Sequence, residues 1–169
     1  IKTTDNAFQL VVLPLHGLNN VNSEGTPVNM IVYDVPKDRK SNWPYQLVDT
    51  RMHATHNFQP IEVPNRLTGL AVGGKQGVQL FLHGANGWAP SGNWFVSGHG
   101  VGEVRNGILS KTEKFTATIE PIHGTMLVVN TKDTRTVISD QLRQGHGLVC
   151  ADFLGQGRDQ IAVGWREKN

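Results

Sequence analysis

An internal repeat restricts the fold of this chain more than any other feature of its sequence. Four segments align with one another, and the first three end in glycine and run into a second strand-like stretch. The segments are residues 8–17, 70–77, 115–124 and 159–165. Their spacing of about 45–60 residues is typical of β-propeller blades, which contain four strands each. The repeat therefore predicts a series of similar blades.

Each repeat unit has a consistent strand order. The glycine-ended segment is the second strand of its unit, and the first, innermost strands are predicted at residues 56–63, 101–109 and 146–153. Third strands are predicted at 28–33, 78–82 and 126–129, and outermost strands at 45–49, 94–97 and 134–138. This order divides the chain into blades at about 1–52, 53–98 and 99–145, with the start of another blade at 146–169.

Composition favours an all-β chain. The 169 residues include 19 glycines and 8 prolines, with β-branched and aromatic runs between them, which is typical of short strands joined by tight turns. No segment combines helical periodicity with helix caps. We expect a β-propeller of four-stranded antiparallel blades, with about three blades in this chain. A β-sandwich is the alternative, although it would not require the repeat.

The sequence indicates which kinds of partner to expect. No stretch reaches the roughly 18 apolar residues of a membrane-spanning helix, so we expect no membrane span. Lysine and arginine are scattered and the net charge is +2, so we expect no nucleic-acid partner. The chain opens at Ile1 in the second strand of a unit, and unpaired sheet edges are prone to aggregate. Further blades or another chain are therefore expected to complete the ring. The sequence does not specify the cellular compartment, and a secreted or periplasmic location is the favoured expectation.

Six of the seven histidines are predicted to gather on one face of the blades. Successive antiparallel strands alternate in direction, so the start of a first strand and the turn between second and third strands lie on the same face. His56 and His146 begin first strands, and His123 lies in such a turn. The other histidines of this face are His16, His53 and His99. His83 is predicted to point to the opposite face.

Neutral imidazoles that converge from separate blades are suitable ligands for zinc or a similar divalent ion. We expect His56, His123 and His146 to hold such an ion at the mouth of the central channel. His53 is expected to act in catalysis as a base, although it could exchange roles with His123 as the third ligand. Any one of these histidines alone would be an ordinary turn or edge residue, so the prediction depends on their convergence.

Charged residues on the same face extend the candidate site. Glu103 and Arg105 alternate with Val104, so their side chains point to one side of the strand. They are expected either to form a cross-strand ion pair or to contact a substrate. Two other features are expected to be structural. Cys150 is predicted to be a small buried hydrophobe, and the loop at residues 152–159 is predicted to be a turn in which carboxylates bind backbone amides rather than calcium.

Residues 150–164, with the sequence Cys-Ala-Asp-Phe-Leu-Gly-Gln-Gly-Arg-Asp-Gln-Ile-Ala-Val-Gly, resemble the FG-GAP (VCBS-type) blade motif. A closer likeness takes in Glu120-Pro-Ile-His-Gly124, Val137-Ile-Ser-Asp140, residues 145–152 and Arg51-Met-His-Ala-Thr-His56. These segments are similar to the propeller domain of the aldos-2-ulose dehydratase family, including its bacterial relatives. The likeness covers residues 50–169, whereas residues 1–49 match by blade pattern.

The resemblance implies a seven-bladed propeller, a zinc ion and dehydration of a keto-sugar such as 1,5-anhydrofructose. This chemistry needs an electrophile at the carbonyl, for which zinc is suited, and groups that move protons. We expect Glu120 and His53 to move protons and Arg105 to contact a sugar hydroxyl. The expected function is a metal-dependent carbon–oxygen lyase (hydro-lyase). The alternative is a non-catalytic carbohydrate- or protein-binding FG-GAP module.

Overall fold

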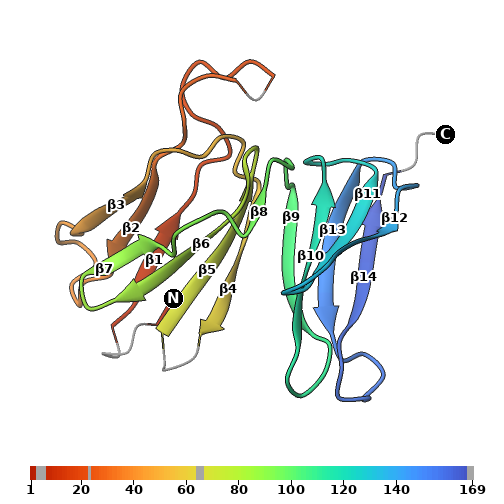
Figure 1. Cartoon of the computed structure of the whole chain (residues 1–169). Helices are drawn as coiled ribbons and strands as arrows, with labels where there is room; N and C mark the ends of the chain where they lie inside the picture. The colour runs from red at the N-terminus through yellow and green to blue at the C-terminus, as the bar shows by residue number, and fades with distance from the viewer. Residues whose placement is uncertain (3–6, 23, 64–66, 167–169) are drawn as a thin grey trace.

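The structure is a computed structural model that describes residues 1–2, 7–22, 24–63 and 67–166. Every regular element in these ranges is a β-strand, which confirms the all-β expectation. The strands form four antiparallel sheets, and each sheet is built from strands that are consecutive in the chain (Figure 1). Within the described part of the chain, no helix is long and apolar enough to cross a membrane.

The sheets contain between two and five strands. The first sheet consists of β1 (Gln9–Val12), β2 (Met30–Asp34) and β3 (Tyr45–Asp49). The second consists of β4 (Asn57–Val63), β5 (Leu67–Gly74), β6 (Gly77–Gly84), β7 (Gly87–Pro90) and β8 (Val96–Ser97). The third consists of β9 (Glu103–Ile108), β10 (Lys114–Glu120), β11 (Met126–Asn130) and β12 (Arg135–Ser139). The fourth consists of β13 (Gly145–Ala151) and β14 (Gln160–Trp165).

The outer edge of the second sheet differs from the expectation. A single outermost strand was expected at residues 94–97, but two short strands share this position beside β6. β7 pairs with the end of β6, from Phe81 to Gly84, whereas β8 pairs with its start at Gly77 and Val78. The cause is a tight hairpin in which Gly84 pairs with Gly87, and Gly87 has a φ of 86° that favours glycine.

The sheets pack face to face in chain order, and each interface has its own apolar core. Alternation along β5 places Leu70 and Val72 against the first sheet and Ala71 against the third. The core between the first and second sheets contains Met30, Val32, Leu70, Val72, Phe81 and Trp88. The core between the second and third sheets contains Ala71, Val78, Val96, Val101 and Val104. The core between the third and fourth sheets contains Phe115, Ala117, Ile119, Leu127, Leu142 and Leu148.

The first strands of the last three sheets lie side by side, because β9 contacts both β4 and β13. This arrangement brings the starts of β4, β9 and β13 to one end of the stack, which is the upper end in Figure 1. Four antiparallel sheets are what the described residues show. A closed ring with seven blades remains a prediction.

Candidate metal centre

Three histidines meet at the end of the stack where the first strands begin. His56 directly precedes β4, His146 is the second residue of β13, and His123 lies in the loop between β10 and β11. One ring nitrogen of each histidine lies within 4.8 Å of a ring nitrogen of each of the other two. The ring centroid of His123 is 3.9 Å from those of both His56 and His146. The structure therefore brings together the three residues that were predicted as metal ligands.

The backbone is in the left-handed region just before each of these histidines. The φ angles are 47° at Ala54, 46° at Ile122 and 52° at Gln144. A positive φ is uncommon outside glycine, and it is a clear outlier for a β-branched residue such as isoleucine. Each such residue costs about 1–3 kcal/mol and persists where the surrounding structure holds it, which is frequently at functional sites. The fold thus tolerates strain in all three segments that carry the histidines.

Gly102 allows two of these segments to approach each other. A Cβ atom at Gly102 would lie 2.5 Å from the carbonyl carbon and oxygen of Ile122. Any side chain at this position would therefore displace the loop that carries His123. The carbonyl oxygen of the same glycine lies 3.1 Å from Nδ1 of His56, so Gly102 helps to position two of the three imidazoles.

Backbone carbonyls determine which ring nitrogen of two histidines is free. Nδ1 of His56 donates to the Gly102 oxygen at 3.1 Å, and Nδ1 of His123 donates to the Gly145 oxygen at 3.3 Å. A carbonyl oxygen can only accept a hydrogen bond, so each Nδ1 must carry the proton. Nε2 of each neutral ring then keeps its lone pair, which is the usual arrangement for a histidine that binds a metal ion.

The donor set fits zinc. Three neutral imidazoles are a known ligand combination for this ion, with Zn–N bonds of about 2.0–2.1 Å. Burial lowers the pKa of both His56 and His123, and repulsion by the neighbouring imidazoles lowers both pKa values further, while the bonds to the backbone carbonyls oppose the shift. The neutral form that binds metal is therefore favoured at neutral pH.

A buried carboxylate lies beside the histidines. The Glu103 side chain is 5% exposed, and its Oε1 is 3.7 Å from Nδ1 of His56. Its Oε2 accepts a hydrogen bond from Nδ2 of Asn57 at 2.5 Å. Burial raises the pKa of Glu103, although the charge of Arg105, the bond from Asn57 and the nearby imidazoles of His123 and His146 oppose this shift. A carboxyl group in this setting can hold and release a proton close to the imidazoles.

Arg105 was predicted at the site, and it lies next to Glu103. Its Nη2 is 3.5 Å from Oε2 of Glu103, and its Nη1 donates to the Val104 oxygen at 2.6 Å. The side chain is 25% exposed, so part of the guanidinium remains open to a ligand. Glu103 and Arg105 therefore form an ion pair, but both residues lie in β9, so the pair is within one strand and not the cross-strand pair that was expected. Contact with a sugar hydroxyl stays a prediction.

Glu120 lies on the other face of its sheet from Glu103. Its side chain is 0% exposed and accepts from Thr118 Oγ1 at 2.6 Å and from Arg135 Nη2 at 2.5 Å. Ile119, next to Glu120 in β10, pairs with Glu103 across the sheet, and neighbouring residues in a strand point to opposite faces. The described contacts of Glu120 are thus with Thr118, Arg135 and, at 3.8 Å, the imidazole of His99, rather than with the three clustered histidines.

His53 is also held by other partners. Its Nδ1 accepts a hydrogen bond from Nε2 of Gln76 at 2.7 Å, and its backbone N–H donates to Oε1 of the same residue at 3.0 Å. The described residues therefore bring Arg105 to the cluster but leave Glu120 and His53 engaged elsewhere. Sequence reasoning did not identify Asn57, although its position directly after His56 at the start of a first strand could have indicated it.

In the loop at residues 152–159 both carboxylates accept from backbone N–H groups, as predicted, whereas Cys150 is half-buried rather than fully buried. Asp152 accepts from the N–H groups of Gln156 and Gly157 at 2.8 and 2.7 Å. Asp159 accepts from the N–H group of Ile108 at 2.8 Å and so ties this loop to β9. Cys150 packs against the core of the third and fourth sheets, and burial raises the pKa of its thiol to about 11, which makes it unreactive at neutral pH.

No protein-family model and no curated protein matches this chain.

Proposed function

We propose that this protein binds zinc or a similar divalent ion through His56, His123 and His146 and dehydrates a small keto-sugar at that site. The observation that carries the proposal is the convergence of three imidazoles from three sheets at one point. A buried carboxylate and a partly exposed guanidinium lie beside them. A keto-sugar such as 1,5-anhydrofructose is the substrate class implied by the sequence resemblance.

The residues of the site match the proton transfers that this reaction needs. A bound metal ion would supply a Lewis acid at the substrate carbonyl. Loss of water from a keto-sugar removes a proton from the carbon beside the carbonyl and returns a proton to the departing hydroxyl. Glu103 suits both transfers, since it is buried, has a raised pKa and contacts the cluster through His56. We assign this role to Glu103 rather than to Glu120, whose described contacts are with Thr118, Arg135 and His99 and not with the three clustered histidines.

Arg105 is the residue that we assign to substrate orientation. Its guanidinium carries five N–H donors, and the described bonds use its Nη1 and place its Nη2 near Glu103. The exposed remainder can donate to hydroxyl oxygens of a sugar. Donation from Arg105 would hold the sugar next to the carboxylate that moves the proton.

The proposal can be tested with the purified wild-type protein. We expect elemental analysis to find about one zinc ion per chain, in line with a site of three imidazole ligands. We also expect 1,5-anhydrofructose to be converted to an unsaturated ketone, which absorbs in the ultraviolet. Chelation should abolish the reaction and added zinc should restore it. Bound metal without turnover of keto-sugars would exclude the lyase and favour the non-catalytic binding module.

The first sheet also supports the expectation that further blades or another chain pack against this one. Strand pairing places Leu10 of β1 and Leu47 and Tyr45 of β3 on the same face of the sheet. Leu10 is 48%, Leu47 50% and Tyr45 67% exposed. The opposite face of this sheet is covered by the second sheet. An uncovered apolar sheet face of this kind marks an interaction surface, and another blade of a ring would cover it.

Charge introduced on this face should prevent association. We expect the wild-type chain to sediment as an assembly and the double variant Tyr45→Lys/Leu47→Lys to sediment as a monomer, because burying two lysines is unfavourable. Leu18→Lys is the matched control, since Leu18 is 77% exposed and lies outside this sheet. A wild-type chain that stays monomeric at high concentration in sedimentation equilibrium would contradict this prediction.

A further inference from the structure

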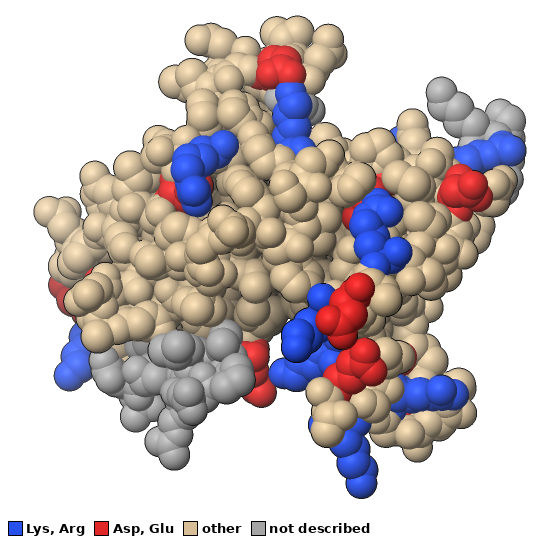
Figure 2. Space-filling view, viewed as in Figure 1, with Lys and Arg blue, Asp and Glu red and all other residues tan. Residues whose placement is uncertain are grey.

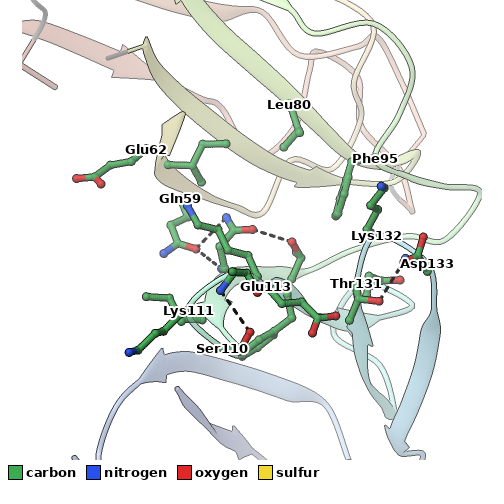
Figure 3. Close-up of a pocket in the computed structure, with 18 of the residues that line it drawn as sticks. Gln59, Glu62, Leu80, Phe95, Ser110, Lys111, Glu113, Thr131, Lys132 and Asp133 are labelled. Carbon is green, nitrogen blue, oxygen red and sulfur yellow. Dashed lines mark hydrogen bonds between the residues drawn. The ribbon is translucent and has the colours of Figure 1, made fainter. Parts of the chain in front are cut away.

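A second candidate site lies at the opposite end of the stack from the histidines. Between the second and third sheets is a cleft of about 1160 Å³ (Figure 3). One wall comes from the later part of β4 and from β6, and the other comes from the β9–β10 hairpin and the β11–β12 turn. His56 precedes β4, whereas the part of β4 that lines the cleft runs from Gln59 to Glu62. The cleft is therefore separate from the candidate metal centre.

A row of side-chain amides and a hydroxyl crosses the polar part of the cleft. Oε1 of Gln59 accepts from the backbone N–H of Asn106 at 2.5 Å, and Oδ1 of Asn106 accepts from Oγ1 of Thr116 at 2.7 Å. These bonds fix the orientation of both amides, so Nε2 of Gln59 carries the donor hydrogens. Among the described residues, no acceptor is bonded to this Nε2. The row thus presents an oriented donor to a ligand.

Asn130 supplies a second donor, and this one is buried. The residue is 7% exposed and lines the cleft. Its Nδ2 has no hydrogen-bond partner among the described residues. A buried donor without an acceptor destabilises the folded state, and an apolar residue of similar size would avoid that cost. Nδ2 itself is buried from solvent, so an oxygen acceptor from a bound ligand would become its partner once the Asn130 side chain turns toward the cleft.

The remaining lining is apolar or balanced in charge. Phe95 is 43% exposed and lines the cleft together with Leu80 and Ile61. The charged lining residues are Lys111, Lys114, Lys132, Glu62, Glu113 and Asp133. Figure 2 shows acidic and basic side chains mixed on this face of the protein. Equal numbers of both signs give no preference for an anion or a cation, so the lining favours a neutral ligand.

We infer that this cleft binds a neutral oligosaccharide. A sugar ring has an apolar C–H face, which fits against Phe95, and hydroxyl oxygens at its edge, which can accept from Asn130 and Gln59. Most ligand pockets have this combination of apolar walls and a few oriented polar groups, and they measure about 300–1000 Å³. The larger cleft has room for more than one ring. This binding does not depend on the metal centre and would hold a saccharide chain away from it.

The test uses the wild-type protein, a panel of neutral and acidic oligosaccharides on an array, and titration calorimetry with the neutral oligosaccharide that binds most strongly. Asn130→Leu should weaken binding about five- to tenfold, the equivalent of one lost hydrogen bond. The same variant should melt at the wild-type temperature or above it, because it removes an unpaired buried donor. Phe95→Ala should weaken binding about tenfold through loss of the apolar wall.

Two controls separate this site from the rest of the protein. Trp165→Ala removes an aromatic residue that is 52% exposed and does not line the cleft, and it should leave binding unchanged. His146→Ala should also leave binding unchanged, even where it abolishes metal binding. The inference is overturned if no neutral oligosaccharide binds at millimolar concentration, if only acidic ligands bind, or if His146→Ala rather than Asn130→Leu removes binding.

Discussion

Replacing Glu103 with Gln is expected to lower kcat/KM for the keto-sugar by about 10²–10⁴-fold, the usual contribution of a positioned proton-transfer group. The amide of the variant can still accept from Asn57 through its oxygen but cannot exchange a proton with substrate. Because Glu103 is not one of the three clustered nitrogen donors, the metal content should stay at the wild-type level. Steady-state kinetics and elemental analysis of the same preparation test both statements.

A matched variant makes this result specific. Glu24→Gln changes a carboxylate that is 70% exposed and paired with Lys75, and it should leave kcat/KM unchanged. Glu120→Gln distinguishes the two candidate carboxylates, since Glu120 faces Arg135 and Thr118. If Glu120→Gln lowered kcat/KM at unchanged stability and Glu103→Gln did not, the assignment of proton transfer to Glu103 would be wrong.

The same variant predicts a change in the pH dependence of stability. Burial raises the pKa of Glu103 above its ordinary value of 4.5. Between the ordinary and the raised pKa the folded state binds more protons than the unfolded state, so the free energy of unfolding falls as pH rises through this window. Arg105, His56, His123 and His146 face the carboxylate and remain in the variant.

Glu103→Gln lacks this titration. The free energy of unfolding of the variant minus that of the wild type should therefore increase as pH rises above 4.5. This difference should become constant above the raised pKa of Glu103. Urea unfolding of both proteins in the presence of chelator measures the difference. A difference that shrinks with rising pH would show that burial does not raise the pKa of this carboxyl.

The sequence allowed most strands to be located, because three of the four aligned segments end in glycine and run into a second strand-like stretch. The division of the outer strand of the second sheet into β7 and β8 was not predicted. It depends on a hairpin closed by the pairing of Gly84 with Gly87, which a search for repeats passes over because other units lack it. Closure into a ring depends on what packs against the free face of the first sheet, and no pattern within the chain specifies that.

The histidine cluster was predictable for a topological reason. The end of a sheet at which a residue lies depends only on strand direction, and strand direction follows from counting strands along the repeat. The choice between Glu103 and Glu120 could not be made in this way. Both lie at the same end of the third sheet, and which face of that sheet lies next to His56 depends on how the sheets pack. The carbonyls of Gly102 and Gly145 escaped prediction because backbone acceptors leave no pattern in a sequence.

Replacing His123 with Ala is expected to remove metal binding and with it the dehydratase activity. His123 lies between the other two imidazoles, with ring centroids at 3.9 Å from both. Loss of an outer partner of a metal ligand already lowers affinity by about 10–100-fold, so loss of a ligand should exceed that range. Competition with a chromophoric zinc chelator measures the affinity. His83→Ala is the control, because His83 lies in β6 and contacts Trp88 at a centroid distance of 5.3 Å.

Measurements on metal-free protein show whether His123→Ala loses metal binding because a ligand is missing or because the variant does not fold. Burial lowers the pKa of His123 below its ordinary value of 6.5. A lowered imidazole pKa gives stability that is present above the ordinary value and is lost as pH falls below it, because the unfolded state then binds more protons. His123→Ala lacks this titrating imidazole. With chelator present, its free energy of unfolding should therefore fall less on acidification than that of the wild type. A variant that is unfolded at neutral pH would mean that His123 serves the fold, whereas a variant equally sensitive to acid would show that burial does not lower the pKa of His123.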